Sequence, residues 1–209
     1  MNTRIRSTVR RAALAAVAVT AAVALAACGS GESGSPSDSR AGVSEGQEDK
    51  KEHNAADVEF AQQMIPHHRQ AVEMAELAFD RAASQEVKEL AQEIKDAQDP
   101  EIETLSEWLS AWGEEVPTGT DGGHGGHGGH GQMPGMMDAG DMAALMESSG
   151  EEFDTAFLTM MIEHHEGAVV MAEAQLKGGA HGPAKELAEE VIAAQTAEIE
   201  RMRELLGES

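Results

Sequence analysis

Two short blocks of this sequence each carry a pair of adjacent histidines with methionines on both sides. The residues are Met64, His67, His68 and Met74 in the first block and Met161, His164, His165 and Met171 in the second. On an α-helix, with about 100° of rotation per residue, the four side chains of each block lie on one face. Imidazole and thioether groups without any thiolate suit copper, above all Cu(I), and also accept Ag(I). The two blocks therefore predict a copper site.

Each of these residue types also has an ordinary structural role. A methionine at helical spacing commonly fills a core, and a lone histidine on an apolar face is commonly a hydrogen-bonded core residue. Here, however, the histidine pairs recur, and burying four imidazoles without partners would be costly unless a shared ligand removed that cost. Zinc rarely uses thioethers. A ferritin-type di-iron site needs a Glu three residues before a His, and the residues that hold those places are Met64, Ile65, Met161 and Ile162.

A second group of candidate ligands lies between the two blocks, in a glycine-rich stretch. Its Gly-Gly-His unit repeats every three residues over 122–130, and a cluster of methionines follows. This pattern favours a labile metal-collecting arm that also takes Cu(II), while the alternative is a flexible linker whose histidines are incidental. The candidate residues are His124, His127, His130, Met133, Met136 and Met137.

The elements that must position both blocks are copies of one another. A shift of 97 residues aligns the second half with the first without a gap, which identifies an internal duplication. Each copy has the apolar spacing of a helical hairpin, with first helices over residues 54–79 and 150–177. Pro66 and Pro100 lie inside these helices, where we expect kinks. We predict an all-α fold, a ferritin-like four-helix bundle made of repeat 1 (54–112), a loop (113–150) and repeat 2 (151–209).

Four other polar residues occupy matching places in the two copies. Gln98 and Gln195 lie on the apolar faces of the second helices, so we predict that each amide oxygen accepts an imidazole N–H and orients that ring for metal. The alternative is that both amides only meet water or a backbone carbonyl. Asp57 and Asp154 precede the histidine blocks and are predicted to cap helices. The remaining His53 and His181 have no counterpart in the other copy, and we expect both at the surface.

The first 27 residues have the pattern of an export signal. A basic segment precedes an apolar run from residue 12 to 27, which ends in Leu25-Ala26-Ala27-Cys28. That ending is typical of a bacterial lipoprotein signal, with lipid on Cys28. Residues 28–53 lack apolar periodicity and predict a disordered tether. The chain would then be exported and anchored by lipid to the outer face of the cytoplasmic membrane.

The composition excludes several other classes of protein. With 15 Lys and Arg against 38 Asp and Glu, the formal charge is −23. The chain is therefore not expected to bind nucleic acid, because binding of its phosphates needs clustered Lys and Arg side chains. Aromatic residues make up 3% of the chain, which disfavours a β-sandwich or barrel. The single Cys excludes an internal disulfide and a thiolate cluster.

The paired blocks resemble the DUF305 family. The resemblance is plainest in residues 60–76 and 157–173 and in the methionine segment 133–137 that leads into residues 141–145, and it covers nearly all of residues 54–209. It implies a ferritin-like four-helix bundle, exported or membrane-anchored, often in copper-resistance settings, and some similar proteins bind copper through His and Met in these blocks. One departure is that Pro66 and Arg69 stand where the second copy has Glu163 and Glu166, so we expect unequal half-sites.

Together these features predict a non-enzymatic lipoprotein that binds and buffers copper outside the cytoplasmic membrane. Its expected partners are the metal ion and the membrane, and no protein partner is indicated. One alternative is a metal-dependent oxidase or hydrolase, which would need an open coordination position and a nearby acid or base such as Glu163 or Glu166. Another is a structural adaptor without metal, in which the histidines form a buried polar network.

The export signal yields the first prediction, that Cys28 carries lipid. The basic segment, the apolar run and the Leu25-Ala26-Ala27-Cys28 ending are the reason. Mass spectrometry of the membrane fraction is expected to find a diacylated N-terminal cysteine. A mature chain cleaved elsewhere and released to the medium would contradict the prediction.

Overall fold

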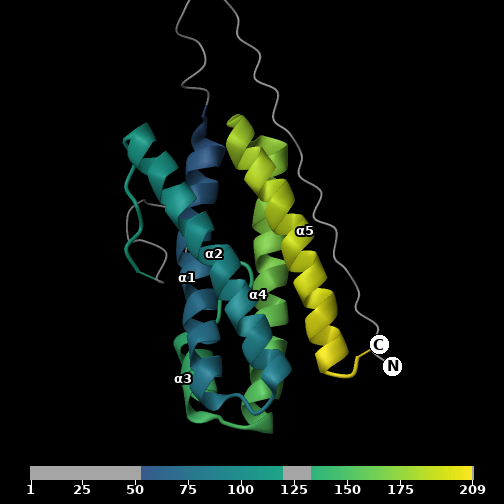
Figure 1. The fold of residues 1–209 in the computed structure, drawn as a ribbon. Coiled ribbons are helices and arrows are strands. Elements are labelled where there is room, and N and C mark those ends of the chain that lie inside the picture. The colour runs from purple at the N-terminus through teal and green to yellow at the C-terminus, as the bar shows by residue number, and fades with distance from the viewer. Residues whose placement is uncertain (1–52, 120–132, 209) are drawn as a thin grey trace, which may run out of the picture. The chain divides into compact units, whose positions relative to one another are not determined.

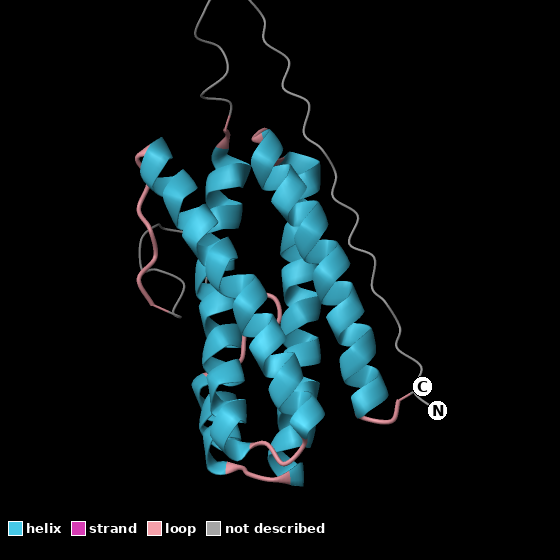
Figure 2. Cartoon of the chain, viewed as in Figure 1, coloured by secondary structure: helices cyan, strands magenta, loops and turns pink. Residues whose placement is uncertain are grey.

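The computed structural model describes residues 53–119 and 133–208, which form five helices and no strand (Figures 1 and 2). The predicted signal, Cys28 and the tether up to residue 52 lie outside these residues, as do His124, His127 and His130. None of the helices described is both long and apolar enough to cross a membrane.

Four long helices form the bundle. They are α1 (Ala55–Arg81), α2 (Gln85–Trp112), α4 (Glu151–Gly178) and α5 (Gly182–Leu205), and a short α3 (Ala139–Glu147) lies between the repeats. The helices α1 and α2 form one hairpin, α4 and α5 form the other, and α1 packs against α4 (Figure 1). The predicted all-α bundle of two duplicated hairpins is confirmed, and the two turns lie 97 residues apart, as the duplication requires.

The local sequence explains where the helices begin and end. Asn54 caps α1, and its side chain and that of Asp57 bond reciprocally to the backbone in a capping box. Ser84 caps α2, which ends at Gly113 in the left-handed conformation (φ +81°) that glycine adopts without strain. Pro66 and Pro100 both lie inside continuous helices.

The core consists of two apolar clusters, each drawing residues from all four long helices. The Met74 cluster includes Ala71, Met74, Leu90, Ile94, Phe153, Phe157, Met161, Ile199 and Met202. The Met64 cluster includes Phe60, Met64, Ile65, Leu105, Leu109, Ala168, Met171, Ala188 and Val191.

Along every long helix, buried polar residues lie between the segments that enter the two clusters. They are His67 and His68 on α1, Gln98 on α2, His164 and His165 on α4, and Gln195 on α5. We call these six residues the polar layer. It crosses the bundle between the two apolar clusters. Most residues that belong to one cluster in the first repeat have their counterparts, 97 residues later, in the other cluster.

Asp57 and Asp154 tie each repeat to the turn of the other. Asp57 on α1 is fully buried and accepts hydrogen bonds from the backbone of Ala180 and His181, at 3.1–3.2 Å. Asp154 on α4 accepts bonds from the matching residues Ala83 and Ser84, at 3.0 and 2.8 Å. The predicted capping role is therefore seen for Asp57, which completes the capping box of α1, but not for Asp154, because the N-terminus of α4 has no side-chain cap. Both aspartates instead bind the turn of the opposite hairpin.

The neighbours of Asp57 also determine its pKa. Burial acts to raise the pKa of this carboxyl, but hydrogen bonds from Gln175 and from the Asn54, Ala180 and His181 backbone together lower it below its usual value. The carboxylate therefore stays charged at neutral pH, and charged acceptors form stronger hydrogen bonds than neutral ones.

This arrangement predicts that Asp57→Ala destabilises the fold more than Asp154→Ala. A hydrogen bond to a charged group contributes about 1.5–3 kcal/mol, and Asp57 is the more buried acceptor with more donors. We expect the free energy of unfolding, measured in urea, to fall by about 3 kcal/mol or more for Asp57→Ala and by about 1.5–3 kcal/mol for Asp154→Ala.

The control for this prediction is Asp141→Ala. Asp141 is exposed and bonds only within the capping box of α3, so its loss should cost about 1 kcal/mol or less. Equal losses for all three variants would contradict the cross-repeat role of Asp57.

Candidate metal centre

The four predicted histidines lie on α1 and α4, in the polar layer of the bundle. The side chains of His67, His68, His164 and His165 are each 0% exposed. The rings of His67 and His164, one from each repeat, stack with centroids 3.8 Å apart and planes inclined by 38°. Burial of all four rings in one layer follows from the duplicated helix faces.

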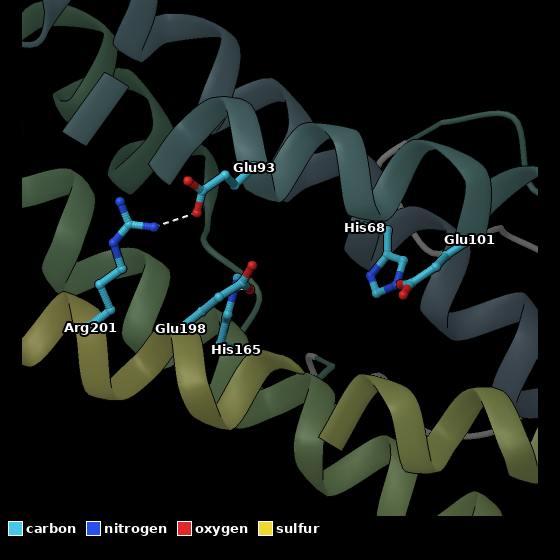
Figure 3. A network of polar contacts seen from close by, with 6 residues as sticks. All are labelled: His68, Glu93, Glu101, His165, Glu198 and Arg201. Carbon is cyan, nitrogen blue, oxygen red and sulfur yellow. Dashed lines mark hydrogen bonds and ion pairs between the residues drawn. The ribbon is translucent and has the colours of Figure 1, made fainter. Parts of the chain in front are cut away.

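Three of the four rings donate a hydrogen bond through Nε2. His68 bonds to Glu101 on α2 at 2.6 Å, and His165 bonds to the matching Glu198 on α5 at 2.8 Å (Figure 3). His67 bonds to the carbonyl oxygen of Pro134 at 3.0 Å. Carboxylate and carbonyl oxygens only accept hydrogen bonds, so Nε2 carries the proton in each case. In a neutral ring, Nδ1 then holds the lone pair that a metal needs.

The nitrogens on the other side of these rings have no partner. Nδ1 is buried without a hydrogen bond in all four histidines, and in His164 Nε2 is also unpaired. Buried polar atoms are rarely left unpaired because the loss of hydration is costly. Each neutral ring keeps one nitrogen with a lone pair, and four such nitrogens without a hydrogen bond in one layer fit a ligand that accepts electron pairs, such as a metal ion.

The methionines lie on both sides of the polar layer. Met64 and Met171 belong to one apolar cluster, and Met74 and Met161 belong to the other. All four are buried, Met171 least completely at 6% exposed. Among the described residues, no three His, Cys, Asp or Glu side chains are grouped to hold a metal ion.

Two of the rings are kept neutral by their surroundings. Burial, with the nearby His68 as the next cause, lowers the pKa of His67 to about 3, although the bond to Pro134 acts to raise it. Burial also holds the pKa of His164 well below its usual value, with His67 as the next cause. Neutral imidazole is the form that binds metal, so these rings need not lose a proton first.

The structure corrects the predicted partners of the imidazoles. The amide oxygens of Gln98 and Gln195 are buried in the polar layer but accept no hydrogen bond, so the predicted Gln–imidazole bond is not formed. Glu101 and Glu198, each three residues further along the same helix, bond to the rings instead. These glutamates recur in the internal duplication, and this recurrence is the one signal in the sequence that could have suggested them.

A strap of residues 133–137 covers the layer on one side. Gln70 holds it through two bonds with the backbone of Met137, at 2.9 and 2.8 Å. The matching position in the other repeat is Gly167, where an added Cβ would lie 2.0 Å from the carbonyl oxygen of Pro134. Gln70 therefore binds the strap, and Gly167, at the same position of the other repeat, leaves room for it. The strap in turn bonds to His67 through Pro134.

The strap also accounts for the three described methionines of the predicted arm. Met133, Met136 and Met137 line an open pocket of about 520 Å³ together with Glu163 and Glu166. Met137, however, is only 8% exposed and packs in the Met74 cluster. A buried core residue does not fit the labile ligand that we predicted at this position.

His53 and His181 are half-buried rather than free at the surface. His53 stacks on Trp112 with ring centroids 4.6 Å apart, and His181 packs edge-on against Trp108 and Trp112 at 5.3 and 5.2 Å. These contacts need tertiary packing and could not be read from the sequence. Neither residue belongs to the polar layer.

Comparison with known proteins gives a consistent result. The family model for a domain of unknown function, DUF305, matches residues 57–206. A Streptomyces coelicolor DUF305 protein, named as a candidate secreted protein, is 32% identical (TM-score 0.64, covering 73% of this chain and 93% of that one). A Deinococcus radiodurans DUF305 fragment is 29% identical (TM-score 0.65, covering 75% and 98%). CopM in its Cu(II)-bound form is 35% identical (TM-score 0.60, covering 71% and 94%), and Cu(I)- and Ag-bound forms of CopM also match. A search of curated proteins found no match.

The lowered pKa values predict that the metal-free protein loses stability in acid. As the pH falls below about 6.5 the unfolded chain protonates both rings, while folded His67, with a pKa of about 3, and folded His164, with a pKa well below its usual value, stay neutral. Stability from these rings is therefore complete above pH 6.5 and falls as the pH decreases, by up to about 1.4 kcal/mol per pH unit for each ring. Urea unfolding at several pH values should show a shallower pH dependence for His67→Asn/His164→Asn than for the wild type.

The control is Gln98→Ala, which alters the same layer without removing a titratable group. It should lower the free energy of unfolding by a similar amount at every pH. If the double histidine variant keeps the slope of the wild type, the two rings are not held neutral.

Proposed function

The chain belongs to the DUF305 family, and from this premise we propose that it binds copper as Cu(I) in the polar layer between α1 and α4. One observation carries the proposal: four fully buried imidazoles present unpaired Nδ1 atoms to a layer that is flanked by thioethers. Imidazole and thioether together favour Cu(I) and Ag(I) over harder cations. The similarity to CopM, a protein with Cu- and Ag-bound structures, supports the same assignment.

The ligands divide naturally into two half-sites. Met64 and His68 are one helical turn apart on α1, and Met171 of α4 belongs to the same cluster as Met64. The duplication repeats this set as Met161, His165 and Met74. We propose that each half-site holds one soft ion through one imidazole and two thioethers, with the stacked His67 and His164 between them.

Binding fits the surroundings of the layer better than catalysis does. A metal-dependent enzyme needs a coordination position that substrate reaches, with an acid or base beside it. All four rings are fully buried, and the exposed Glu166 is paired with Arg203 at 2.6 Å. A purely structural bundle is disfavoured by the unpaired nitrogens, because apolar residues of similar size would avoid their cost.

We further propose that the protein acts outside the cytoplasmic membrane as a lipid-anchored copper buffer. The leader ending at Cys28 supports export, and so does the candidate secreted protein among the similar structures. A net charge of −23 would attract cations to the domain.

Anaerobic titration tests the proposed function. Cu(I) and Ag(I) should bind tightly to the metal-free protein, and Zn(II) weakly. Deleting residues 121–131 should leave the tight Cu(I) binding intact and remove weaker Cu(II) sites, because side chains on rigid helices lose little entropy on binding while a glycine-rich chain must first be ordered. Loss of Cu(I) binding on this deletion would show that the bundle site is wrong.

A matched pair of variants separates the polar layer from other histidines. His68→Ala/His165→Ala should abolish tight Cu(I) binding. His53→Ala/His181→Ala removes the same number of imidazoles, but from the contacts with Trp108 and Trp112. This variant should leave the Cu(I) affinity and the number of bound ions unchanged.

A further inference from the structure

We infer that Glu101 and Glu198 are positioning residues that make Nδ1 the metal-binding nitrogen of His68 and His165. The inference rests on the proposed copper site and adds to it the two carboxylates, the ring nitrogen that binds, and the order in which the four imidazoles are used. Figure 3 shows both glutamate–histidine pairs.

The tautomer follows from the chemistry of the contact. A carboxylate has no proton to donate, so the short bonds from His68 to Glu101 (2.6 Å) and from His165 to Glu198 (2.8 Å) place the proton on Nε2. The opposite nitrogen, Nδ1, is buried and unpaired in both rings. When a metal binds one nitrogen of an imidazole, a hydrogen bond from the other nitrogen to a carboxylate fixes the ring orientation and makes the imidazole a better electron donor to the metal.

The four rings of the layer differ in the strength of this support. His68 and His165 each bond to a carboxylate, His67 bonds to a neutral carbonyl, and His164 has no carboxylate partner. A charged acceptor polarises the ring more than a neutral one. The first ions should therefore bind to His68 and His165, and the stacked pair should contribute only afterwards.

The two carboxylates also balance the charge of the ions. A cation that enters a buried layer of neutral ligands loses its hydration, and a nearby opposite charge offsets part of that cost. Glu101 and Glu198 are 19% and 20% exposed, which keeps them partly shielded from water beside fully buried rings. One carboxylate in each half-site matches one monovalent ion in each, so we expect two Ag(I) or Cu(I) ions per chain.

The first experiment measures Cu(I) affinity by anaerobic competition with a colorimetric Cu(I) chelator. Glu101→Gln and Glu198→Gln should each lower the affinity of one of the two sites by about 10–100-fold, the usual effect of losing such a partner, and the double variant should weaken both. Circular dichroism of each variant should show the helical content of the wild type.

The matched control is Glu93→Gln. Glu93 also lies on α2 and carries the same charge, but it pairs with Arg201 at the surface (Figure 3). Its loss should leave both affinities unchanged. If Glu93→Gln weakens binding as much as Glu101→Gln, the effect is one of overall charge and the positioning role is wrong.

The second experiment needs no variant. Long-range ¹H–¹⁵N spectra of the imidazoles should show Nε2 protonated in metal-free His68 and His165, and Ag(I) should shift the Nδ1 signals of these two rings first. A shift at Nε2, or earlier binding at His67 and His164, would overturn the inference while leaving the proposed copper function intact. If the wild-type bundle binds neither Ag(I) nor Cu(I), the proposed function itself fails.

Discussion

Four imidazole rings lie in the middle of a helical bundle, out of reach of water, where each polar atom without a hydrogen bond raises the free energy of the fold by about 1–3 kcal/mol. The apolar clusters on both sides offset that cost, since each fully buried large side chain contributes about 1.5–3 kcal/mol. The glutamates of α2 and α5 and the strap then pair one nitrogen of three of the rings. Nδ1 remains unpaired in all four rings, and in His68 and His165 it is the nitrogen left with a lone pair for a soft metal.

The duplication explains both the symmetry of this arrangement and its one conspicuous exception. The His–Glu pairs, the methionines and the aspartates that hold the opposite turns all recur 97 residues apart. Position 70 breaks the pattern, because Gln70 binds the strap while its counterpart Gly167 makes room for it. The strap then bonds to His67 but not to His164. The surroundings of His67 and His164 therefore differ. The sequence predicted unequal half-sites from Pro66 and Arg69, and the difference seen here lies at the next residue, Gln70.

Much of the fold could be predicted because its determinants are local or repeated. Apolar spacing indicated the helices, the duplication indicated the two hairpins, and the His and Met faces indicated the buried layer. The partners of the rings could not be predicted in the same way. Gln98 and Glu101 are less than one turn apart on α2, and helical periodicity alone does not determine which of them reaches His68. The seat of the strap on Gly167 and the packing of His181 on the tryptophans depend on contacts between distant segments, which no local pattern encodes.

In the proposed copper site, selectivity for soft ions would come from two features that act at different ranges. The strongly negative chain attracts any cation, so its long-range field cannot distinguish copper from magnesium or calcium. Discrimination must come from the interior, where a hard ion would give up strongly held water for thioethers that bind it poorly. A soft monovalent ion has less hydration to lose and gains both thioethers and polarised imidazoles. Burial of the polar layer, which makes the unpaired nitrogens costly in the metal-free protein, is thus also what would exclude the hard cations that the surface charge attracts.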